Sequence, residues 1–186
     1  MKDAMYINVP NFLSILRIMS IPLLIILLSY GEQVAALTVF VCAAVSDALD
    51  GFIARRFKQK TVVGAYLDPI ADKLLLTSSF IAFALLGLIP KWLSILVVSR
   101  DIIIAMGILI LQLVSVRVEI RPSVVSKCTT VFQLTTIGGR LLFDILHRNQ
   151  DALTYLYWVT GFLTIVSGLQ YVVRGLRIVN ETKIEG

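Results

Sequence analysis

Four aspartates lie close together in this sequence, at spacings that could bring their carboxylates to one place. They are Asp47, Asp50, Asp68 and Asp72, and all four fall within 26 residues. The first pair is three residues apart and the second pair is four apart, so each pair shares one face of a helix. If the two helices pack as a hairpin, the four carboxylates converge, and they remain ionised together only with cations among them.

Hard cations suit a site of this kind, because its side-chain ligands are all oxygen atoms. Carboxylates favour Mg²⁺, Mn²⁺ or Ca²⁺ over zinc, and the chain has a single histidine, His147. Two divalent ions held by the aspartates would bind a pyrophosphate and stabilise the charge of its leaving group. Asp68 alone has a second interpretation, because Pro69 follows it and an aspartate before a proline can cap a helix.

Small residues and an arginine accompany the aspartates. Gly51 and Ala54 continue the face of the first aspartate pair with almost no side chain, which leaves space for a flat group such as a nucleobase or ribose. Arg55 follows at the expected membrane edge, where its guanidinium suits a phosphate. Gly64 is expected either in a turn or at another point of close approach.

Long apolar segments must position these residues. Of the 186 residues, 58% are hydrophobic and 16% are charged, whereas about 25% are charged in an ordinary soluble domain. This composition excludes a disordered chain and places the protein in a bilayer. We predict an all-α integral membrane protein, a bundle of six transmembrane helices in one domain. The expected spans are 11–30, 33–56, 68–88, 91–116, 123–146 and 152–175.

Basic residues lie mostly on one side of these spans. Eleven lysines and arginines fall on one side, and only Lys91 and Arg148 fall on the other. The positive-inside rule therefore predicts that both termini and the aspartate cluster face the cytoplasm, from a multi-pass protein of the cytoplasmic (inner) membrane. The net charge of +5 follows from this bias, so no nucleic-acid partner is expected.

A cation transporter with an aspartate-lined site is a rival from another functional class. It would explain paired carboxylates in membrane helices. It does not explain why Gly51, Ala54 and Arg55 follow the first aspartate pair at these positions. It also does not explain why the cluster lies at the cytoplasmic edge of the membrane. We therefore favour an enzyme that acts on a pyrophosphate.

The pattern D-x2-D-G-x2-A-R-x8-G-x3-D-x3-D is complete in residues 47–72. It resembles the signature of the CDP-alcohol phosphatidyltransferases, and the likeness extends over nearly the whole chain. Residues 8–17 resemble the opening of the family's glycerophospholipid branch, and residues 122–133 resemble its fifth helix.

The resemblance implies six transmembrane helices in a homodimer, with two ions, Mg²⁺ or Mn²⁺, held by the four aspartates. It implies that Asp72 is the general base for an acceptor hydroxyl, which attacks the β-phosphorus of CDP-diacylglycerol so that CMP leaves. It also implies a set of residues that bind the cytidine nucleotide: Asp47, Gly51, Ala54, Arg55 and Gly64.

Two acceptors fit the resemblance, phosphatidylglycerol in cardiolipin synthases and glycerol 3-phosphate in phosphatidylglycerophosphate synthases. The second branch tends to read S-R-E where this chain has Ser99-Arg100-Asp101, with another arginine where this chain has Ile108. The segment looks more like the cardiolipin branch. We therefore favour phosphatidylglycerol and keep glycerol 3-phosphate as the alternative.

Four basic or polar residues are candidates for contact with the acceptor. Arg100 has two open interpretations, an internal charge pair or a ligand of the acceptor phosphate. Lys127, Thr130 and Gln133 recur every three residues and are predicted to contact the acceptor, although Lys127 could instead extend to the membrane interface. Arg17, inside the first span, is expected to be structural or to support the site.

Overall fold

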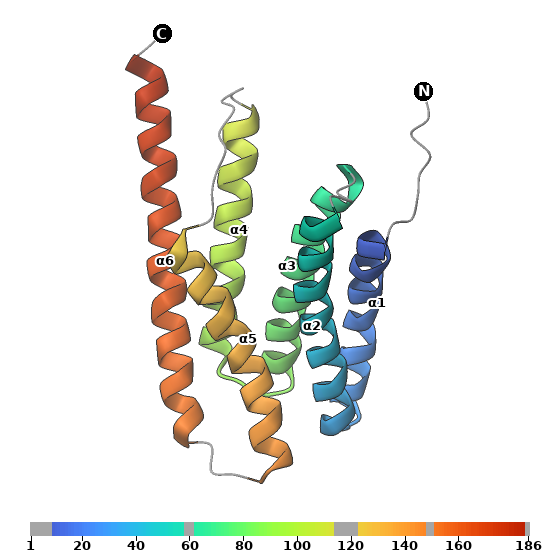
Figure 1. Cartoon of the computed structure of the whole chain (residues 1–186). Helices are drawn as coiled ribbons and strands as arrows, with labels where there is room; N and C mark the ends of the chain where they lie inside the picture. The colour runs from blue at the N-terminus through green and yellow to red at the C-terminus, as the bar shows by residue number, and fades with distance from the viewer. Residues whose placement is uncertain (1–8, 58–61, 114–122, 148–150, 185–186) are drawn as a thin grey trace. The chain divides into compact units, whose positions relative to one another are not determined.

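The structure is a computed structural model, and it describes residues 9–57, 62–113, 123–147 and 151–184. Within these ranges the side chains of residues 9–11, 47–57, 62–69, 111–113 and 178–184 are not described. The described residues form six helices and no strand (Figure 1). The helices are α1 (Val9–Ser29), α2 (Gln33–Phe57), α3 (Val62–Leu85), α4 (Lys91–Leu113), α5 (Val124–Ile145) and α6 (Asp151–Ile184).

Within the described ranges, three helices are long and apolar enough to cross a membrane, and they support a multi-pass membrane protein. The qualifying stretches are Phe12–Ser29 of α1, Lys91–Ile110 of α4 and Asp151–Arg177 of α6, and α2 adds a shorter apolar stretch, Gln33–Ser46. Large apolar side chains on these helices are exposed, as lipid-facing residues would be. The prediction of an all-α membrane protein with six helices is confirmed.

Two helix boundaries differ from the expected spans. α3 begins at Val62 and not at 68, because the apolar residues before Asp68 continue the helix toward its N-terminus. α6 continues to Ile184, beyond the expected end at 175, because backbone hydrogen bonds can extend a helix past its apolar part into polar residues. The spacing of the apolar segments predicted the helices, but hydropathy alone did not fix their ends.

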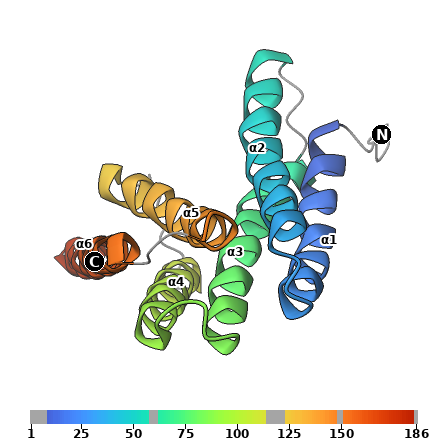
Figure 2. The same ribbon diagram turned by 90° about the horizontal axis from the view of Figure 1, so that it is seen from below.

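The chain forms two compact units, of residues 1–82 with 141–148 and of residues 83–140 with 149–186. In the first unit α1 packs along α2, and in the second α4 packs along α6 (Figures 1 and 2). Ala36 and Ala43 of α2 are buried, and small residues of this kind allow membrane helices to pack closely. The single domain expected from the sequence stays a prediction.

Glycines in the left-handed conformation end two of the helices. Gly31 (φ 76°) follows α1, and Gly87 (φ 70°) follows α3. The amide of Glu32 donates to the carbonyl of Leu27 at 2.9 Å, which closes α1 in a Schellman-type turn. His147 adopts the same kind of conformation (φ 48°) after α5, so the single histidine ends a helix.

A tryptophan pair marks the packing of α4 against α6. The rings of Trp92 and Trp158 have centroids 4.9 Å apart and are tilted by 31°. Gly161 lies one turn after Trp158 on α6. A Cβ atom on Gly161 would lie 2.7 Å from Cζ3 of Trp92, closer than real contacts allow. Gly161 is therefore the residue that lets the Trp92 ring approach α6.

Replacing Gly161 by alanine is expected to destabilise the contact between α4 and α6. The added methyl group must push the Trp92 ring away, and overpacking of this kind costs about 1–3 kcal/mol. Thermal unfolding of the detergent-solubilised protein, followed by tryptophan fluorescence, measures the effect. The matched control is Gly175→Ala in the same helix, where a Cβ meets nothing within 4 Å. Equal unfolding temperatures for the two variants would contradict this account.

Candidate functional site

Two consecutive helices of the first unit carry the aspartate motif. Asp47 and Asp50 lie in the second half of α2, and Asp68 and Asp72 lie in the first half of α3. Because both segments are continuous helices, each pair occupies one helix face, as the spacing predicted. Of the four side chains only that of Asp72 is described.

The residues expected to bind the nucleotide lie on the same two helices. α2 carries Gly51, Ala54 and Arg55 immediately after the first aspartate pair, and α3 carries Gly64 in its first turn. Gly64 therefore does not lie in a turn between helices. The remaining interpretation is that another group approaches the backbone closely at Gly64. The side chains of Ala54 and Arg55 lie outside the described part of the structure.

The capping interpretation of Asp68 is wrong. α3 starts at Val62, so Asp68 and Pro69 lie inside the helix and not at its N-terminus. Proline inside a helix removes one backbone hydrogen bond, and sequence reasoning therefore placed the boundary there. With the cap excluded, a metal ligand is the interpretation that remains for Asp68.

Asp72 forms an ion pair with a buried arginine of α1. Nη1 of Arg17 donates to Oδ1 of Asp72 at 2.6 Å. The side chain of Arg17 is 0% exposed, whereas that of Asp72 is 41% exposed. Arg17 therefore binds the Asp72 carboxylate from the buried side, while part of the Asp72 side chain remains exposed. One feature of the sequence points to Arg17, namely a charge within an apolar span, which marks a functional residue by default.

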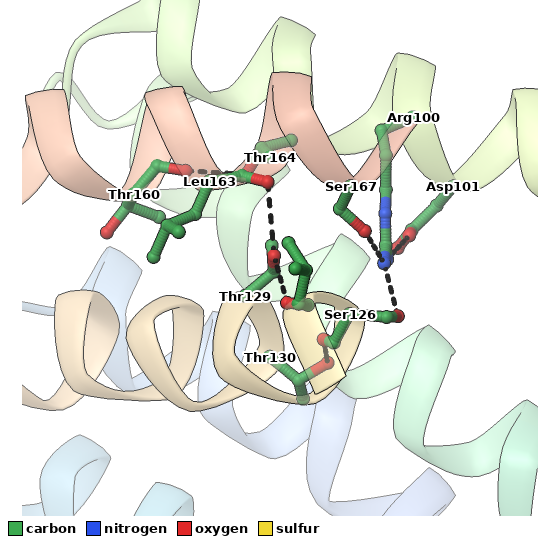
Figure 3. Close-up of polar contacts among 10 residues, drawn as sticks. Arg100, Asp101, Ser126, Thr129, Thr130, Thr160, Leu163, Thr164 and Ser167 are labelled. Carbon is green, nitrogen blue, oxygen red and sulfur yellow. Dashed lines mark hydrogen bonds and ion pairs between the residues drawn. The ribbon is translucent and has the colours of Figure 1, made fainter. Parts of the chain in front are cut away.

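Arg100 connects three helices of the second unit (Figure 3). Its Nη1 donates to Oδ1 of Asp101 at 2.7 Å, and its Nη2 donates to Oγ of Ser126 at 2.7 Å and of Ser167 at 2.8 Å. These contacts join α4 to α5 and α6, and they include the internal charge pair that the sequence suggested. Its Nε is buried and has no hydrogen-bond partner among the residues that the structure describes. A role toward the acceptor stays a prediction.

The three predicted acceptor residues of α5 differ in their surroundings. Lys127 is exposed, Thr130 is half-buried and bonds to the carbonyl of Ser126 at 3.2 Å, and Gln133 is fully buried. A three-residue step turns a helix about 60° short of a full circle, so the three side chains drift around α5. Both polar atoms of the Gln133 amide are buried, and neither has a hydrogen-bond partner in the described part of the chain.

Sequence reasoning missed a polar face on α5. Polar residues recur at alternating steps of three and four, as at a helix–helix contact. They are Ser126, Thr129, Gln133, Thr136 and Arg140. The hydroxyl of Thr129 donates to the carbonyl of Leu163 at 3.2 Å, and Thr136 bonds to Thr160 at 2.8 Å. α5 thus contacts α6 through hydrogen bonds, as membrane helices often do.

No group of three potential metal ligands occurs among the side chains that the structure describes. Asp47, Asp50 and Asp68 lie outside that set, so the metal prediction rests on the donor chemistry of the motif and on its placement in α2 and α3. Fold and motif together define a helical, multi-pass membrane protein with an aspartate-rich motif on two consecutive helices.

Comparison with known proteins identifies the family. Residues 7–166 match the family model described as CDP-alcohol phosphatidyltransferase. The match covers most of the 186 residues and includes the whole motif in residues 47–72. The chain belongs to the CDP-alcohol phosphatidyltransferase family, and the resemblance seen in the sequence is confirmed.

Curated relatives carry names from both acceptor branches. The chain is 32% identical over 177 residues to a "Probable phosphatidylglycerophosphate synthase" of Mycobacterium tuberculosis, with 91% of this chain and 82% of the relative covered. It is 35% identical over 175 residues to a "CDP-diacylglycerol--glycerol-3-phosphate 3-phosphatidyltransferase" of Pseudomonas fluorescens, with coverages of 87% and 84%. It is 32% identical over 182 residues to a "Probable cardiolipin synthase (CMP-forming)" of Drosophila melanogaster, with coverages of 89% and 56%.

These likenesses make the protein a phosphatidyltransferase, a membrane enzyme of phospholipid synthesis. The family's substrates are CDP-diacylglycerol and a glycerol-type acceptor in a lipid membrane. Because both kinds of synthase occur among the relatives, their names do not decide between the two acceptors.

Proposed function

We propose that this enzyme transfers the phosphatidyl group of CDP-diacylglycerol to a hydroxyl of phosphatidylglycerol, with release of CMP. The observation that carries the reaction is the complete motif of residues 47–72, on two consecutive helices of one unit. The choice of acceptor rests on Asp101 and Ile108 of α4, which depart from the glycerol 3-phosphate branch. Glycerol 3-phosphate is the second candidate, because two relatives of comparable length carry names from that branch.

Divalent metal is part of the proposal. The donor set fits Mg²⁺ or Mn²⁺, because α2 and α3 each present a pair of carboxylates on one face, and the described carboxylate of Asp72 is partly exposed. Two such ions, held by Asp47, Asp50, Asp68 and Asp72, would bind the pyrophosphate and stabilise the negative charge of departing CMP.

The cytidine nucleotide is assigned to the face of α2 that follows the first aspartate pair. Gly51 and Ala54 leave room for the nucleoside, and Arg55 supplies a positive charge for a phosphate. Asp47 on α2 and Gly64 in the first turn of α3 complete the set.

Asp72 is the proposed general base. The acceptor oxygen forms a bond to the β-phosphorus, and the bond from that phosphorus to the bridging oxygen breaks. The electron pair leaves with CMP, and the proton of the acceptor hydroxyl passes to the Asp72 carboxylate. A base must lie within hydrogen-bond reach of the proton that it removes. The partial exposure of Asp72 supports this role, because an acceptor can approach it.

Buried polar groups without partners support an acceptor site in the second unit. Such groups cost roughly 1–3 kcal/mol each unless a hydrogen bond satisfies them. Nε of Arg100 and the amide of Gln133 are groups of this kind, and both belong to predicted acceptor residues. Phosphate oxygens of the acceptor would accept hydrogen bonds from Nε of Arg100 and Nε2 of Gln133, and an acceptor hydroxyl would donate to Oε1 of Gln133. Lys127, which is exposed, and Thr130 complete the proposed set on α5.

The setting in the cell is also proposed. The excess of basic residues on one side of the helices supports an active site and both termini in the cytoplasm, with the protein in the inner membrane. The family resemblance supports a homodimer.

The acceptor is tested by offering phosphatidylglycerol and glycerol 3-phosphate in parallel to the purified enzyme with CDP-diacylglycerol and Mg²⁺. We expect faster CMP release with phosphatidylglycerol. Its phosphodiester carries one negative charge and needs fewer basic partners than a phosphate monoester. The variant Ile108→Arg should impair use of phosphatidylglycerol or shift the enzyme toward glycerol 3-phosphate. Brisk turnover of glycerol 3-phosphate by the wild type, without use of phosphatidylglycerol, would overturn this acceptor assignment.

A further inference from the structure

We infer that Arg17 is a positioning residue for the transfer, which fixes the carboxylate of Asp72 in its working orientation. The inference rests on the proposed function, in which Asp72 acts on the acceptor hydroxyl. The inference gives a role in the reaction to α1, which carries no residue of the motif in residues 47–72, through its contact with Asp72 of α3.

The first support is the burial of a permanent charge. Arg17 is fully buried in an apolar helix, where a guanidinium is expensive unless its partners satisfy it. α1 packs elsewhere through ordinary apolar residues, since Leu24 and Leu28 are buried on the same helix. A buried ion pair adds little stability compared with well-packed apolar residues. Helix packing alone therefore does not account for an arginine at this position.

The second support is the geometry at Asp72. The Arg17 contact binds one named oxygen, Oδ1, from the buried side, while 41% of the Asp72 side chain remains exposed. The α3 backbone is also held at this point, because Ala71 and Leu75 on either side of Asp72 are buried. Backbone and carboxylate are both fixed, so the exposed part of Asp72 faces a substrate in one defined orientation.

The expected consequence follows from the sensitivity of proton transfer to geometry. A displacement of about 1 Å in a reacting group can cost on the order of 100-fold in rate. Loss of the guanidinium removes the contact that orients Oδ1 of Asp72, so the rate of the chemical step should fall. Binding of the nucleotide, which is assigned to residues of α2 and to Gly64, should change little.

The test compares Arg17→Met and Arg17→Lys with the wild type in purified, lipid-reconstituted enzyme. The readouts are kcat, KM for CDP-diacylglycerol, CDP binding by calorimetry and the unfolding temperature. We expect Arg17→Met to lower kcat on the order of 100-fold, with KM and CDP binding within about threefold of the wild type. Arg17→Lys should recover part of the loss, because the charge remains but the planar donor pair is lost.

Arg140→Met provides the matched control. Arg140 is also a buried arginine, and its Nε donates to the backbone carbonyl of Leu88 at 2.6 Å in the second unit. Its loss should lower the unfolding temperature and leave kcat unchanged. A purely structural Arg17 would behave in the same way.

Three outcomes separate the inference from the proposed function. If Arg17→Met folds and keeps wild-type kcat while Asp72→Asn is inactive, the inference fails and the proposed function stands. If Asp72→Asn is active, the base assignment itself fails. If Arg17→Met does not fold, Arg17→Lys decides. A lowered kcat with intact CDP binding supports the inference, and a wild-type kcat overturns it.

Discussion

Replacing Asp72 by asparagine is expected to abolish turnover while CDP binding largely survives. The amide cannot accept the proton of the acceptor hydroxyl, whereas the groups assigned to the nucleotide, apart from the shared metal, lie elsewhere on α2 and α3. The variant also replaces the ion pair with Arg17 by a contact to a neutral amide, so folding has to be measured beside turnover. Release of CMP, CDP calorimetry and thermal unfolding on one preparation distinguish lost chemistry from lost folding.

Asp144→Asn is the control for this experiment. Asp144 lies in the same unit, and its Oδ2 accepts a hydrogen bond from Nε2 of Gln33 at 3.3 Å. It has no place in the proposed site, so turnover should be retained. Near-wild-type turnover in Asp72→Asn would require another group to act as the base.

Removal of divalent metal is expected to stop the reaction completely, and Mg²⁺ or Mn²⁺ should restore it. Carboxylates are the only ligands proposed for the ions, so a chelator in excess leaves the pyrophosphate without its counter-charge. Asp47→Asn and Asp50→Asn should each lose Mn²⁺ binding and activity together. Electron paramagnetic resonance of added Mn²⁺ measures binding independently of turnover, and Asp144→Asn serves again as the control.

The metal model has two clear points of failure. Full turnover in excess chelator would rule out metal dependence. An Asp47→Asn or Asp50→Asn variant with unchanged Mn²⁺ binding and activity would remove that residue from the site and leave the other assignments to be tested separately.

Most of the fold could be predicted from apolar segment lengths, because each helix in a membrane must satisfy its own backbone hydrogen bonds. The ends were less predictable. Asp68-Pro69 has the composition of a helix start, yet α3 continues through it from Val62. At the other end of the chain, α6 runs to Ile184 although its apolar part ends earlier.

The site was predictable where it depends on spacing within one helix. The spacing of Asp47, Asp50 and Gly51 determines which face of α2 they share, and no other helix is needed for that prediction. The pair between Arg17 and Asp72 joins residues 55 apart and depends on how helices pack, which no local pattern encodes. The contacts of Arg100 could likewise not be predicted from the sequence, because its partner Ser167 lies 67 residues further along the chain.

The Arg100 network also places a constraint on the biosynthesis of the protein. Helices enter the membrane in the order of their synthesis, and an arginine at the centre of an inserting helix costs about 2.5–3.5 kcal/mol. Of the three partners that the structure describes for Arg100, Asp101 alone is present when α4 inserts, since Ser126 and Ser167 are synthesised 26 and 67 residues later. The guanidinium gains its last partner only when α6 arrives. A chain that stalls before Ser167 would thus leave Arg100 of α4 without one of its hydrogen bonds inside the bilayer.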